Sequence, residues 1–530
     1  MTAGGRTQSL DRLDATLGAR AALRLRLVCP SQEFSAEEMS FGVGRWLSSS
    51  RGLWESLRVA SEPDLSLVMV QAPPVGPDVE DYLLDLVPPG PTSAADRRAR
   101  HALVEIEDHS ERHLSEKLLD APCLLRRLGH TVDVARRAGH TVEGLACFAS
   151  SARMAALARA LGLDLLEADP RLLGWGSKSG SRQLFRAAGV SHAPGSYMAD
   201  HDLSSLAARI AALVRTHGPG QWLVKLDHGF GSGHGNALVV IDNDRPSAVE
   251  RELRTSLQPM GAGVGRARYL QWLGRAGAVV ERRLGADAGC VIRHPSALAH
   301  LRPVPGGPAR VEPLGVHDQL VGTAGDYLGC RYPARHEYHD EVARQARRVF
   351  SALARRGLSG HVGVDFMAVS PGRGAAPSLF ATEINVRQTG STHPNRTVRA
   401  VLPLDRAVPG RLVGRDGRDV CFRATDSVWS PSSRGMSAAP LIAALRRSPR
   451  LRLDREAGRG VIPHLWPALG RFGKMGVTAI GGSAEECDRL ITEFADLLDT
   501  LGEAAASSRD REPSAVEGTA LSRSLGEVPP

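Results

Sequence analysis

Apolar runs of strand length alternate with stretches of helical spacing over the first third of the chain. The predicted strands are Leu23–Pro30 and Leu65–Gln71. Helical stretches lie between and after them, notably Ser115–Leu128 and Ala152–Leu161. Strands that alternate with helices predict an open α/β domain. We place this domain at residues 21–175. Residues 1–20 before it are polar, and we expect them to be disordered.

Beyond residue 176 the pattern changes to short β-type runs separated by glycine-rich turns. The predicted strands are Trp222–Leu226, Ala237–Ile241, Ala278–Leu284, Cys290–Arg293, His361–Val369, Leu379–Arg387 and Gly476–Ile480. Helices are predicted at Ser181–Ala188, Leu203–Thr216, about 337–356 and Ala484–Leu501. Residues 503–530 are rich in Ser, Glu, Pro and Gly, a composition typical of a disordered tail.

Composition excludes several classes of protein. Apolar residues make up 42% of the 530 residues, which is ordinary for a globular protein. No apolar run is long enough to span a membrane, and no apolar signal region precedes the first predicted strand, so we expect a cytoplasmic protein without a membrane partner. The seven cysteines are widely spaced, which argues against a disulfide framework and a structural zinc site.

The net charge of +8 raises the question of a nucleic-acid partner. The arginines are dispersed, however, and aromatic residues make up only 5% of the chain. We therefore expect no nucleic-acid partner. Small anionic substrates such as nucleotides suit a basic chain equally well.

Lysine is rare in this chain, and its few positions are informative. Of the 66 basic Lys and Arg residues, only Lys117, Lys178, Lys225 and Lys474 are lysine. Arginine replaces lysine wherever a long cation is merely solvated, but it fits poorly where a compact ammonium is needed. Lys178 and Lys225 lie in glycine-rich segments, where backbone N–H groups and an ammonium together suit phosphate. For Lys117 and Lys474 we favour a remnant of coding composition.

A glycine loop separates two of the short strands. Gly229, Gly231, Gly233 and Gly235 alternate with other residues between the strand that carries Lys225 and the strand that follows. The loop lacks the Gly-Lys-Ser/Thr of a Walker A motif, and it leads into a strand, unlike a dinucleotide-binding fingerprint. A hairpin with such a tip could close over a triphosphate. The alternative is an ordinary glycine-rich surface turn.

A second hairpin carries acidic and amide groups. Glu383, Asn385 and Arg387 share one face of a predicted strand, and Asp365 lies in the strand before it. If the connecting loop is symmetric about Gly374, Asp365 lies opposite Glu383, with Cβ atoms about 5 Å apart. Two facing carboxylates and an amide suit Mg²⁺, and Mn²⁺ as a substitute. The alternative is a bulged loop with ordinary surface carboxylates.

Taken together, the two hairpins resemble the ATP-binding site of ATP-grasp ligases. The resemblance implies that Asp365, Glu383 and Asn385 hold Mg²⁺ and that Lys225 and the glycine loop bind ATP. It also implies a phosphate contact for Lys178, an adenine or ribose contact for Glu281, and a ribose contact for Asp287. The implied fold has two α+β lobes that grip ATP, at residues 176–400 with a lid at about 190–275. A pre-ATP-grasp domain precedes this core, and residues 401–502 complete the ligase.

More narrowly, the chain is similar to the peptide ligase of pheganomycin biosynthesis and its actinobacterial relatives. The stretches that match are Trp175–Arg182, His317–Leu320, Tyr327–Pro333, Gly390–Pro394 and Gly473–Ile480. The chain departs from the family pattern in three ways. Leu226 follows Lys225 where a proline is common, and Gly363 stands where some family ligases carry an arginine. A third phosphate lysine has no counterpart between residues 226 and 473, and Arg282, Arg283 or Arg293 could replace it. His393 either contacts substrate or orients the end of the strand.

The resemblance implies an enzyme that joins a carboxylate to an amine through an acylphosphate and releases ADP. Its substrates would be amino acids or peptides. Lys225 and Arg387 would be catalytic, with Arg387 holding the carboxylate and the oxyanion, because a guanidinium grips two oxygens at once. Two alternatives stay open: a kinase acting on a small-molecule hydroxyl, and a non-catalytic nucleotide-binding protein. The sequence leaves the oligomeric state open, with a homodimer among the options.

Overall fold

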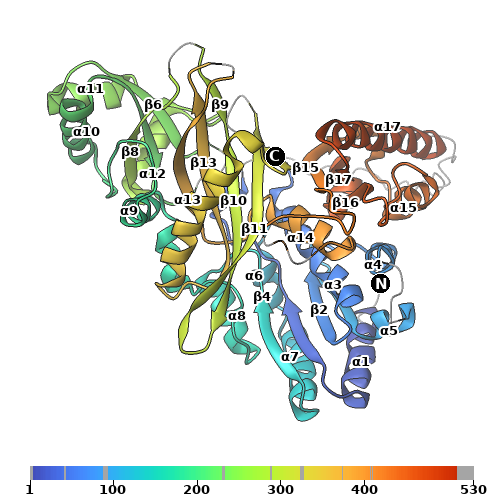
Figure 1. Cartoon of the computed structure of the whole chain (residues 1–530). Coiled ribbons are helices and arrows are strands. Elements are labelled where there is room, and N and C mark those ends of the chain that lie inside the picture. The colour runs from blue at the N-terminus through green and yellow to red at the C-terminus, as the bar shows by residue number, and fades with distance from the viewer. Residues whose placement is uncertain are drawn as a thin grey trace, which may run out of the picture.

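The computed structural model describes residues 4–509, apart from 41–42, 88–92, 230–232, 287–288, 323–326, 373, 406–407 and 409. Within that part the chain forms three sheets (Figure 1). The N-terminal sheet lies at the bottom of the view, the lid sheet at the upper left, and a long central sheet joins the middle to the C-terminal part.

The N-terminal sheet is parallel, in the order β3-β2-β1-β4. Its strands are β1 (Arg24–Val28), β2 (Leu65–Gln71), β3 (His101–Glu105) and β4 (Thr141–Ala146). Every residue of β2 is buried, as expected for a parallel strand that helices cover on both faces. The predicted open α/β domain is therefore present.

Short helices connect and cover this sheet. They are α1 (Gly4–Ala19), α2 (Ala36–Met39), η1 (Arg45–Leu57), α3 (Arg58–Ser61), α4 (Pro77–Asp85), α5 (Ala94–Ala99), α6 (Leu114–Leu119), α7 (Pro122–Arg137), α8 (Ala152–Ala160) and η2 (Pro170–Gly176). The single helix predicted at Ser115–Leu128 is wrong: α6 ends before Pro122, which starts α7. Proline lacks the backbone N–H that a helix interior needs but fits the first helical turn.

The expectation that residues 1–20 are disordered is wrong for residues 4–19, which form α1. Leu10, Leu13 and Leu17 recur at helical spacing and are fully buried in the core of the N-terminal domain. These three leucines form one narrow apolar face, which is enough to anchor the helix on the core. The polar residues between them hide this face in the sequence.

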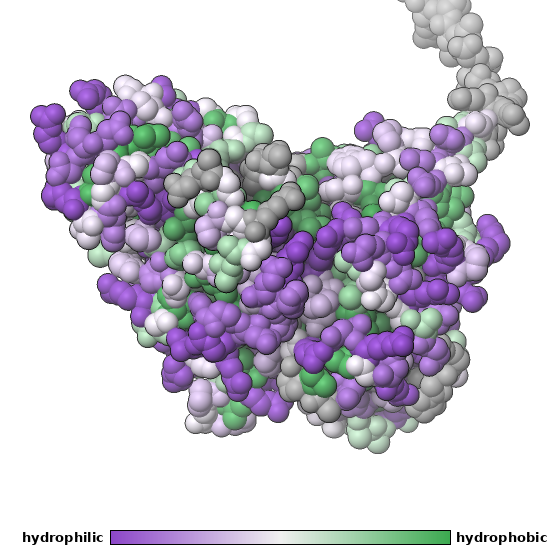
Figure 2. Space-filling model, turned by 45° about the horizontal axis from the view of Figure 1, so that its top comes forward, coloured by the Kyte–Doolittle hydropathy of each residue, from purple (hydrophilic) through white to green (hydrophobic). Residues whose placement is uncertain are grey.

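The lid sheet is small and antiparallel, in the order β7-β6-β5-β8. Its strands are β5 (Gly220–Leu226), β6 (Asn236–Ile241), β7 (Gln258–Pro259) and β8 (Ala278–Arg282), and its helices are α10 (Leu203–His217), α11 (Pro246–Thr255) and α12 (Arg266–Ala276). The helices and the sheet bury a core of their own around Trp222 and Tyr269. The lid forms the left-hand lobe in Figure 2.

The central sheet runs in the order β14-β13-β10-β11-β12-β15-β17-β16, with β9 paired to β13. Its strands are β9 (Val291–Arg293), β10 (Pro295–Val304), β11 (Gly307–Val321), β12 (Tyr327–Tyr332), β13 (Gly360–Ser370), β14 (Ser378–Asn385), β15 (Cys421–Trp429), β16 (Gly460–His464) and β17 (Lys474–Gly481). The accompanying helices are α9 (Lys178–Ala188), α13 (His336–Ala354), α14 (Thr392–Val401), η3 (Pro431–Ser433), α15 (Ala438–Arg447), α16 (Trp466–Phe472) and α17 (Ala484–Arg509). The strands after residue 401 extend the sheet that carries the acidic hairpin.

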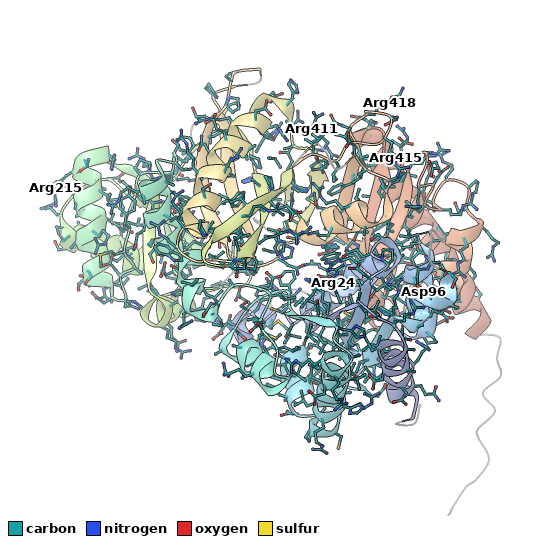
Figure 3. All side chains as sticks on the ribbon, turned by 60° about the horizontal axis from the view of Figure 1, so that its bottom comes forward. Arg24, Asp96, Arg215, Arg411, Arg415 and Arg418 are labelled. Atoms are coloured by element: carbon teal, nitrogen blue, oxygen red, sulfur yellow. The ribbon has the colours of Figure 1, made fainter. Side chains whose placement is uncertain are left out.

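The remaining features concern the C-terminal helix and the exposed surface. Helix α17 continues to Arg509, so the predicted disordered tail is wrong for residues 503–509, and residues 510–530 lie outside the described part. None of the helices in the described ranges is long and apolar enough to cross a membrane. Exposed arginines are spread from the lid to the C-terminal part, as Arg215, Arg411, Arg415 and Arg418 illustrate (Figure 3).

Candidate active site

Asp365 and Glu383 lie directly opposite each other in the β13–β14 hairpin, which confirms the predicted register. The neighbouring pairs, Val364 with Ile384 and Gly363 with Asn385, keep the same register. A bulge does exist, but it begins immediately after the acidic pair, on the loop side. The bulge leaves Thr382 unpaired, and its hydroxyl donates to the Asp365 carbonyl oxygen at 3.1 Å.

Amide and ammonium groups surround the two carboxylates. Asn385 Nδ2 donates to Asp365 Oδ2 at 2.9 Å, and Gln319 Nε2 donates to Asp365 Oδ1 at 2.6 Å. Lys178 Nζ lies 2.5 Å from Glu383 Oε1. The sequence reasoning did not single out Gln319, although it lies in the matched stretch His317–Leu320 of β11. No local signal marks Gln319, because the same strand also carries Arg310, Glu312, His317 and Asp318.

The surroundings move the pKa values of the two acids apart. Burial, and then the charge of Glu383, raise the pKa of Asp365 to about 6. Burial also works against the ionised form of Glu383, but the ammonium of Lys178, with Arg387 and Lys225, outweighs it and holds the pKa of Glu383 below its ordinary value. A carboxylate whose charge is disfavoured, next to a second carboxylate and an amide oxygen, fits a hard divalent cation such as Mg²⁺.

We expect Mg²⁺ or Mn²⁺ binding to weaken as the pH is lowered through about 6. The raised pKa of Asp365 means that a proton occupies this carboxyl below that pH and competes with the cation. The same shift lowers the stability of the metal-free protein as the pH rises to 6, so added metal should raise the melting temperature more at pH 7.5 than at pH 5. Thermal melts with and without metal across this range measure it. A metal-induced rise that does not change with pH contradicts it.

Lys225 pairs with Glu281 across two strands of the lid. Lys225 Nζ on β5 lies 2.6 Å from Glu281 Oε2 on β8, and Arg182 Nη1 lies 3.0 Å from Glu281 Oε1. Glu281 is only 4% exposed, so its buried charge is balanced by two cations. Lys225 also lowers the pKa of Glu383, so both predicted phosphate lysines act on the acidic hairpin.

Asp227 joins the two lysine-bearing segments, and the sequence reasoning missed it. Its carbonyl oxygen accepts from the Lys178 N–H at 3.0 Å. Its carboxylate accepts from the backbone N–H of Ser179 at 2.6 Å and from the Ser179 hydroxyl at 3.0 Å. The end of β5 is therefore fastened to the start of α9, and the lid meets the lobe that carries Lys178.

The glycine loop turns in the conformation that glycine favours. Gly229 and Gly233 have φ angles of +71° and +78°, and Gly235 accepts hydrogen bonds from Leu226 N–H at 2.8 Å and from Tyr269 at 3.0 Å. A Cβ atom on Gly229 would lie 3.3 Å from Glu38 Oε2, so the loop approaches α2 of the N-terminal domain. Two predicted site residues, Gly231 and Asp287, lie outside the described residues.

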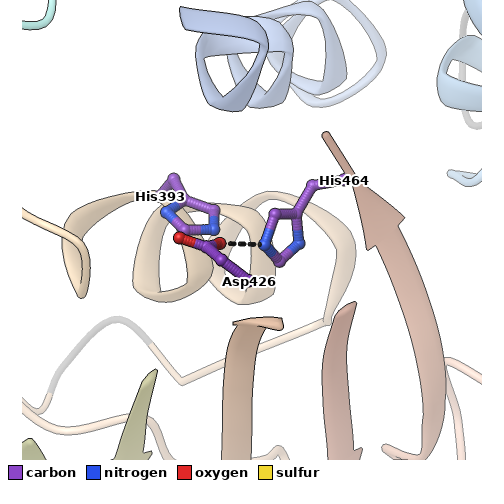
Figure 4. A group of neighbouring side chains, drawn as sticks. All are labelled: His393, Asp426 and His464. Atoms are coloured by element: carbon purple, nitrogen blue, oxygen red, sulfur yellow. Dashed lines mark hydrogen bonds and ion pairs between the residues drawn. The ribbon is translucent and has the colours of Figure 1, made fainter. Parts of the chain in front are cut away.

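His393 belongs to a buried cluster with Asp426 and His464 (Figure 4). His464 Nε2 lies 2.8 Å from Asp426 Oδ1, and the rings of His393 and His464 are 4.5 Å apart. Burial is the main cause that lowers the pKa of both histidines, to about 3 for His464. Arg51 forms an ion pair with the second oxygen of Asp426, so that carboxylate is already neutralised. The cluster places His393 near the start of α14, and neither of its ring nitrogens has a hydrogen-bond partner among the described residues.

Comparisons with known proteins agree with this geometry. A family model described as an ATP-grasp domain matches residues 306–391. The chain is 30% identical over 442 residues to the L-propargylglycine–L-glutamate ligase of Streptantibioticus cattleyicolor, a match that covers 81% of this chain and 84% of that protein.

Solved structures align with most of the chain at low sequence identity. The biotin carboxylase of Campylobacter jejuni superposes with a TM-score of 0.51 and 12% identity, over 92% of this chain and 96% of that one. The biotin carboxylase domain of the 2-oxoglutarate carboxylase of Hydrogenobacter thermophilus, solved with MgADP, gives a TM-score of 0.47 and 13% identity, over 89% of each chain.

The chain belongs to the ATP-grasp family, and the resemblance inferred from its motifs is confirmed. Within that family it is an ATP- and Mg²⁺-dependent ligase that joins a carboxylate to an amine and forms ADP. The kinase and the non-catalytic alternatives are not favoured.

Proposed function

We propose that this ligase forms a peptide or amide bond between an amino acid, or an amino-acid derivative, and the amino group of a second amino acid or peptide. The observation that carries the proposal is the facing pair Asp365 and Glu383, which Lys178 and Lys225 both influence. The similarity to a ligase named for L-propargylglycine and L-glutamate supports amino acids as both partners.

In the proposed reaction an oxygen of the substrate carboxylate attacks the γ-phosphorus of ATP, and the bond from that phosphorus to the β-phosphate oxygen breaks. ADP leaves, and an acylphosphate remains. The amine nitrogen then attacks the acyl carbon. The C–O bond to phosphate breaks, phosphate leaves with the electron pair, and the nitrogen loses a proton to solvent. Such transfer depends on positioning and on charge neutralisation.

Residues of the two hairpins supply these functions. Asp365, Glu383 and Asn385 would hold Mg²⁺, which neutralises charge on the phosphates when bound. Lys178 and Lys225 would exchange their carboxylate partners for phosphate oxygens, and Gly229, Gly233 and Gly235 would leave room for phosphate beside the loop N–H groups. Arg387 follows β14, the strand that carries Glu383 and Asn385, and its guanidinium would hold the reacting carboxylate and the oxyanion.

We expect ADP and phosphate to appear only when both a carboxylate and an amine are present, with an amide as the product. The test combines the purified protein, ATP and Mg²⁺ with pairs of amino acids and peptides, and measures ADP release and product mass. AMP and pyrophosphate as products would exclude the acylphosphate route. A phosphorylated product that is stable to amines would favour a kinase instead.

Nucleotide should protect the glycine hairpin. Peptides covering residues 225–241 should exchange their amide hydrogens more slowly when a non-hydrolysable ATP analogue and Mg²⁺ are added, because the loop would donate N–H groups to phosphate. The tip of the β10–β11 hairpin, residues 303–308, lies outside the proposed site and serves as an internal control. Equal exchange with and without nucleotide counts against a closing flap.

A further inference from the structure

The carboxyl edge of the N-terminal sheet faces the C-terminal end of β14, the strand that carries Glu383 and Asn385. In the order β3-β2-β1-β4 the connections run in opposite directions from β1, and open α/β sheets bind ligands in the crevice outside such a reversal. The loop after β4 reaches the segment that follows β14: the Gln388 N–H donates to the Phe148 carbonyl at 3.0 Å, and Gln388 Nε2 donates to the Cys147 carbonyl at 3.0 Å. Arg387, the residue before Gln388, is thereby held beside the loop that follows β4.

Two guanidinium groups from different domains share one aromatic ring at this edge. Arg45 Cζ lies 4.9 Å and Arg387 Cζ lies 5.5 Å from the centre of the Phe34 ring. Within the described ranges neither side chain forms a hydrogen bond or an ion pair. Nearby Glu38 attracts Arg45, but its carboxylate accepts from the Ser35 N–H at 3.1 Å and hydroxyl at 3.2 Å.

Two half-buried like charges beside one ring carry an energetic cost. Burial is the main cause that lowers the pKa of Arg45, and the charge of Arg387 lowers it further. The neighbouring Arg51 does not offset the repulsion between Arg45 and Arg387, because it is itself cationic and paired with Asp426. Bound carboxylates would remove this cost, because a carboxylate matches a guanidinium group in both charge and shape.

An unsatisfied amide lies in the same loop. Gln32 follows β1 and is only 4% exposed, yet neither its Nε2 nor its Oε1 has a hydrogen-bond partner among the described residues. Buried amides are almost always bonded, so this one calls for a polar partner. Its donor and its acceptor suit a ligand with both a carbonyl or carboxylate oxygen and an N–H group.

We propose that the carboxyl edge of the N-terminal sheet, at Gln32, Phe34 and Arg45, is the binding site of the amine substrate, and that Arg45 holds a free carboxylate of that substrate while Arg387 beside it keeps the reacting carboxylate of the other substrate. The amine substrate would then be an α-amino acid or a peptide with an unblocked carboxyl terminus, and Gln32 would bond its polar backbone. The reacting carboxylate of the other substrate would lie at the metal site. This inference rests on the proposed ligase function.

The test compares the twenty L-amino acids with their α-carboxamides as amine substrates, in the presence of ATP, Mg²⁺ and a mixture of amino acids as acid partners. We expect products that retain the free carboxylate of the amine partner, and rates at least about tenfold lower for the carboxamides, because a charge-assisted pair is lost. Arg45→Gln should raise the KM for the amine about tenfold and leave the KM for ATP unchanged, while Arg45→Lys should retain part of the binding. Carboxamides used as readily as free acids would overturn the inference.

Arg268→Gln is the matched control. The Arg268 guanidinium lies 4.9 Å from the centre of the Trp272 ring, the same separation as Arg45 from Phe34, but on the exposed face of the lid. It should change neither KM. An effect on the amine KM equal to that of Arg45→Gln would show that the change is nonspecific.

Binding without turnover separates this inference from the proposed function. Free amino acids, but not their α-carboxamides, should slow hydrogen exchange in residues 32–45 of the wild-type protein and not in Arg45→Gln. If no pair forms an amide, the proposed function fails, and this exchange pattern still decides the inference. If amides form while no amino acid protects residues 32–45, the inference fails and the function stands.

Discussion

Asp365→Asn and Glu383→Gln should each reduce Mg²⁺-dependent ATP turnover at least about a hundredfold and leave the fold intact. The two carboxylates face each other across β13 and β14, so each variant removes one charged ligand from a shared cation. The loss should be one of turnover with saturating substrates, because the metal would neutralise charge that develops on the transferring phosphate. Steady-state ADP release measures it, and circular dichroism checks the fold.

Asp340→Asn is the control for this experiment. Asp340 is fully exposed on α13, away from the hairpin, and its replacement should leave turnover unchanged. Near wild-type turnover in both Asp365→Asn and Glu383→Gln would show that the facing pair does not bind the catalytic metal.

Lys225→Arg should weaken ATP binding about tenfold or more, although it conserves charge. The residue Lys225 as a whole is 8% exposed, and its ammonium lies 2.6 Å from Glu281. A planar guanidinium is wider and prefers to grip two oxygens at once, so it would displace its neighbours or point elsewhere. A titration with a fluorescent ATP analogue measures the change.

Lys117→Arg is the comparison, and the structure changes what we expect of it. Lys117 is 3% exposed, and its Nζ donates to the carbonyls of Asp108 at 2.9 Å and Ser110 at 2.7 Å, so it is more than a remnant of composition. The arginine variant should melt a few degrees lower, as the loss of about 1 kcal/mol implies, with unchanged ATP affinity. Equal effects of both variants on nucleotide affinity would contradict the prediction that Lys225 contacts the phosphates of ATP.

The acidic hairpin was predictable because its information is local. A loop centred on Gly374 and the two-residue period of strands fix which side chains face each other, and the bulge at Thr382 falls outside the pair that matters. Gln319 and Asp227 were not predictable in this way. Their roles depend on β11 lying beside β10, and on the end of β5 meeting α9, and both contacts join segments far apart in the chain.

The long strands β10 and β11 also escaped the sequence pattern. Pro295, Pro303 and Pro313 interrupt their apolar periodicity, and proline usually argues against a strand. A missing N–H costs little at each of them, because Pro295 is the first residue of β10, Pro313 lies at a register shift, and Pro303 lies in the exposed outer part of the hairpin. The helix α1 escaped for a related reason, since a stripe of three leucines is too sparse to stand out.

All four lysines are buried or half-buried, and this limits their reaction with reagents that modify amines. The side chains of Lys178 and Lys225 are each 11% exposed, Lys117 is buried, and Lys474 is half-buried, with a pKa that burial, and then Arg51, lower to about 8. Acylating reagents that modify amines therefore meet hardly any competing surface lysines. Because its lowered pKa leaves more of Lys474 as the free amine, peptide mass mapping must separate Lys474 from Lys178 and Lys225, and the modification of those two then reports whether nucleotide covers them.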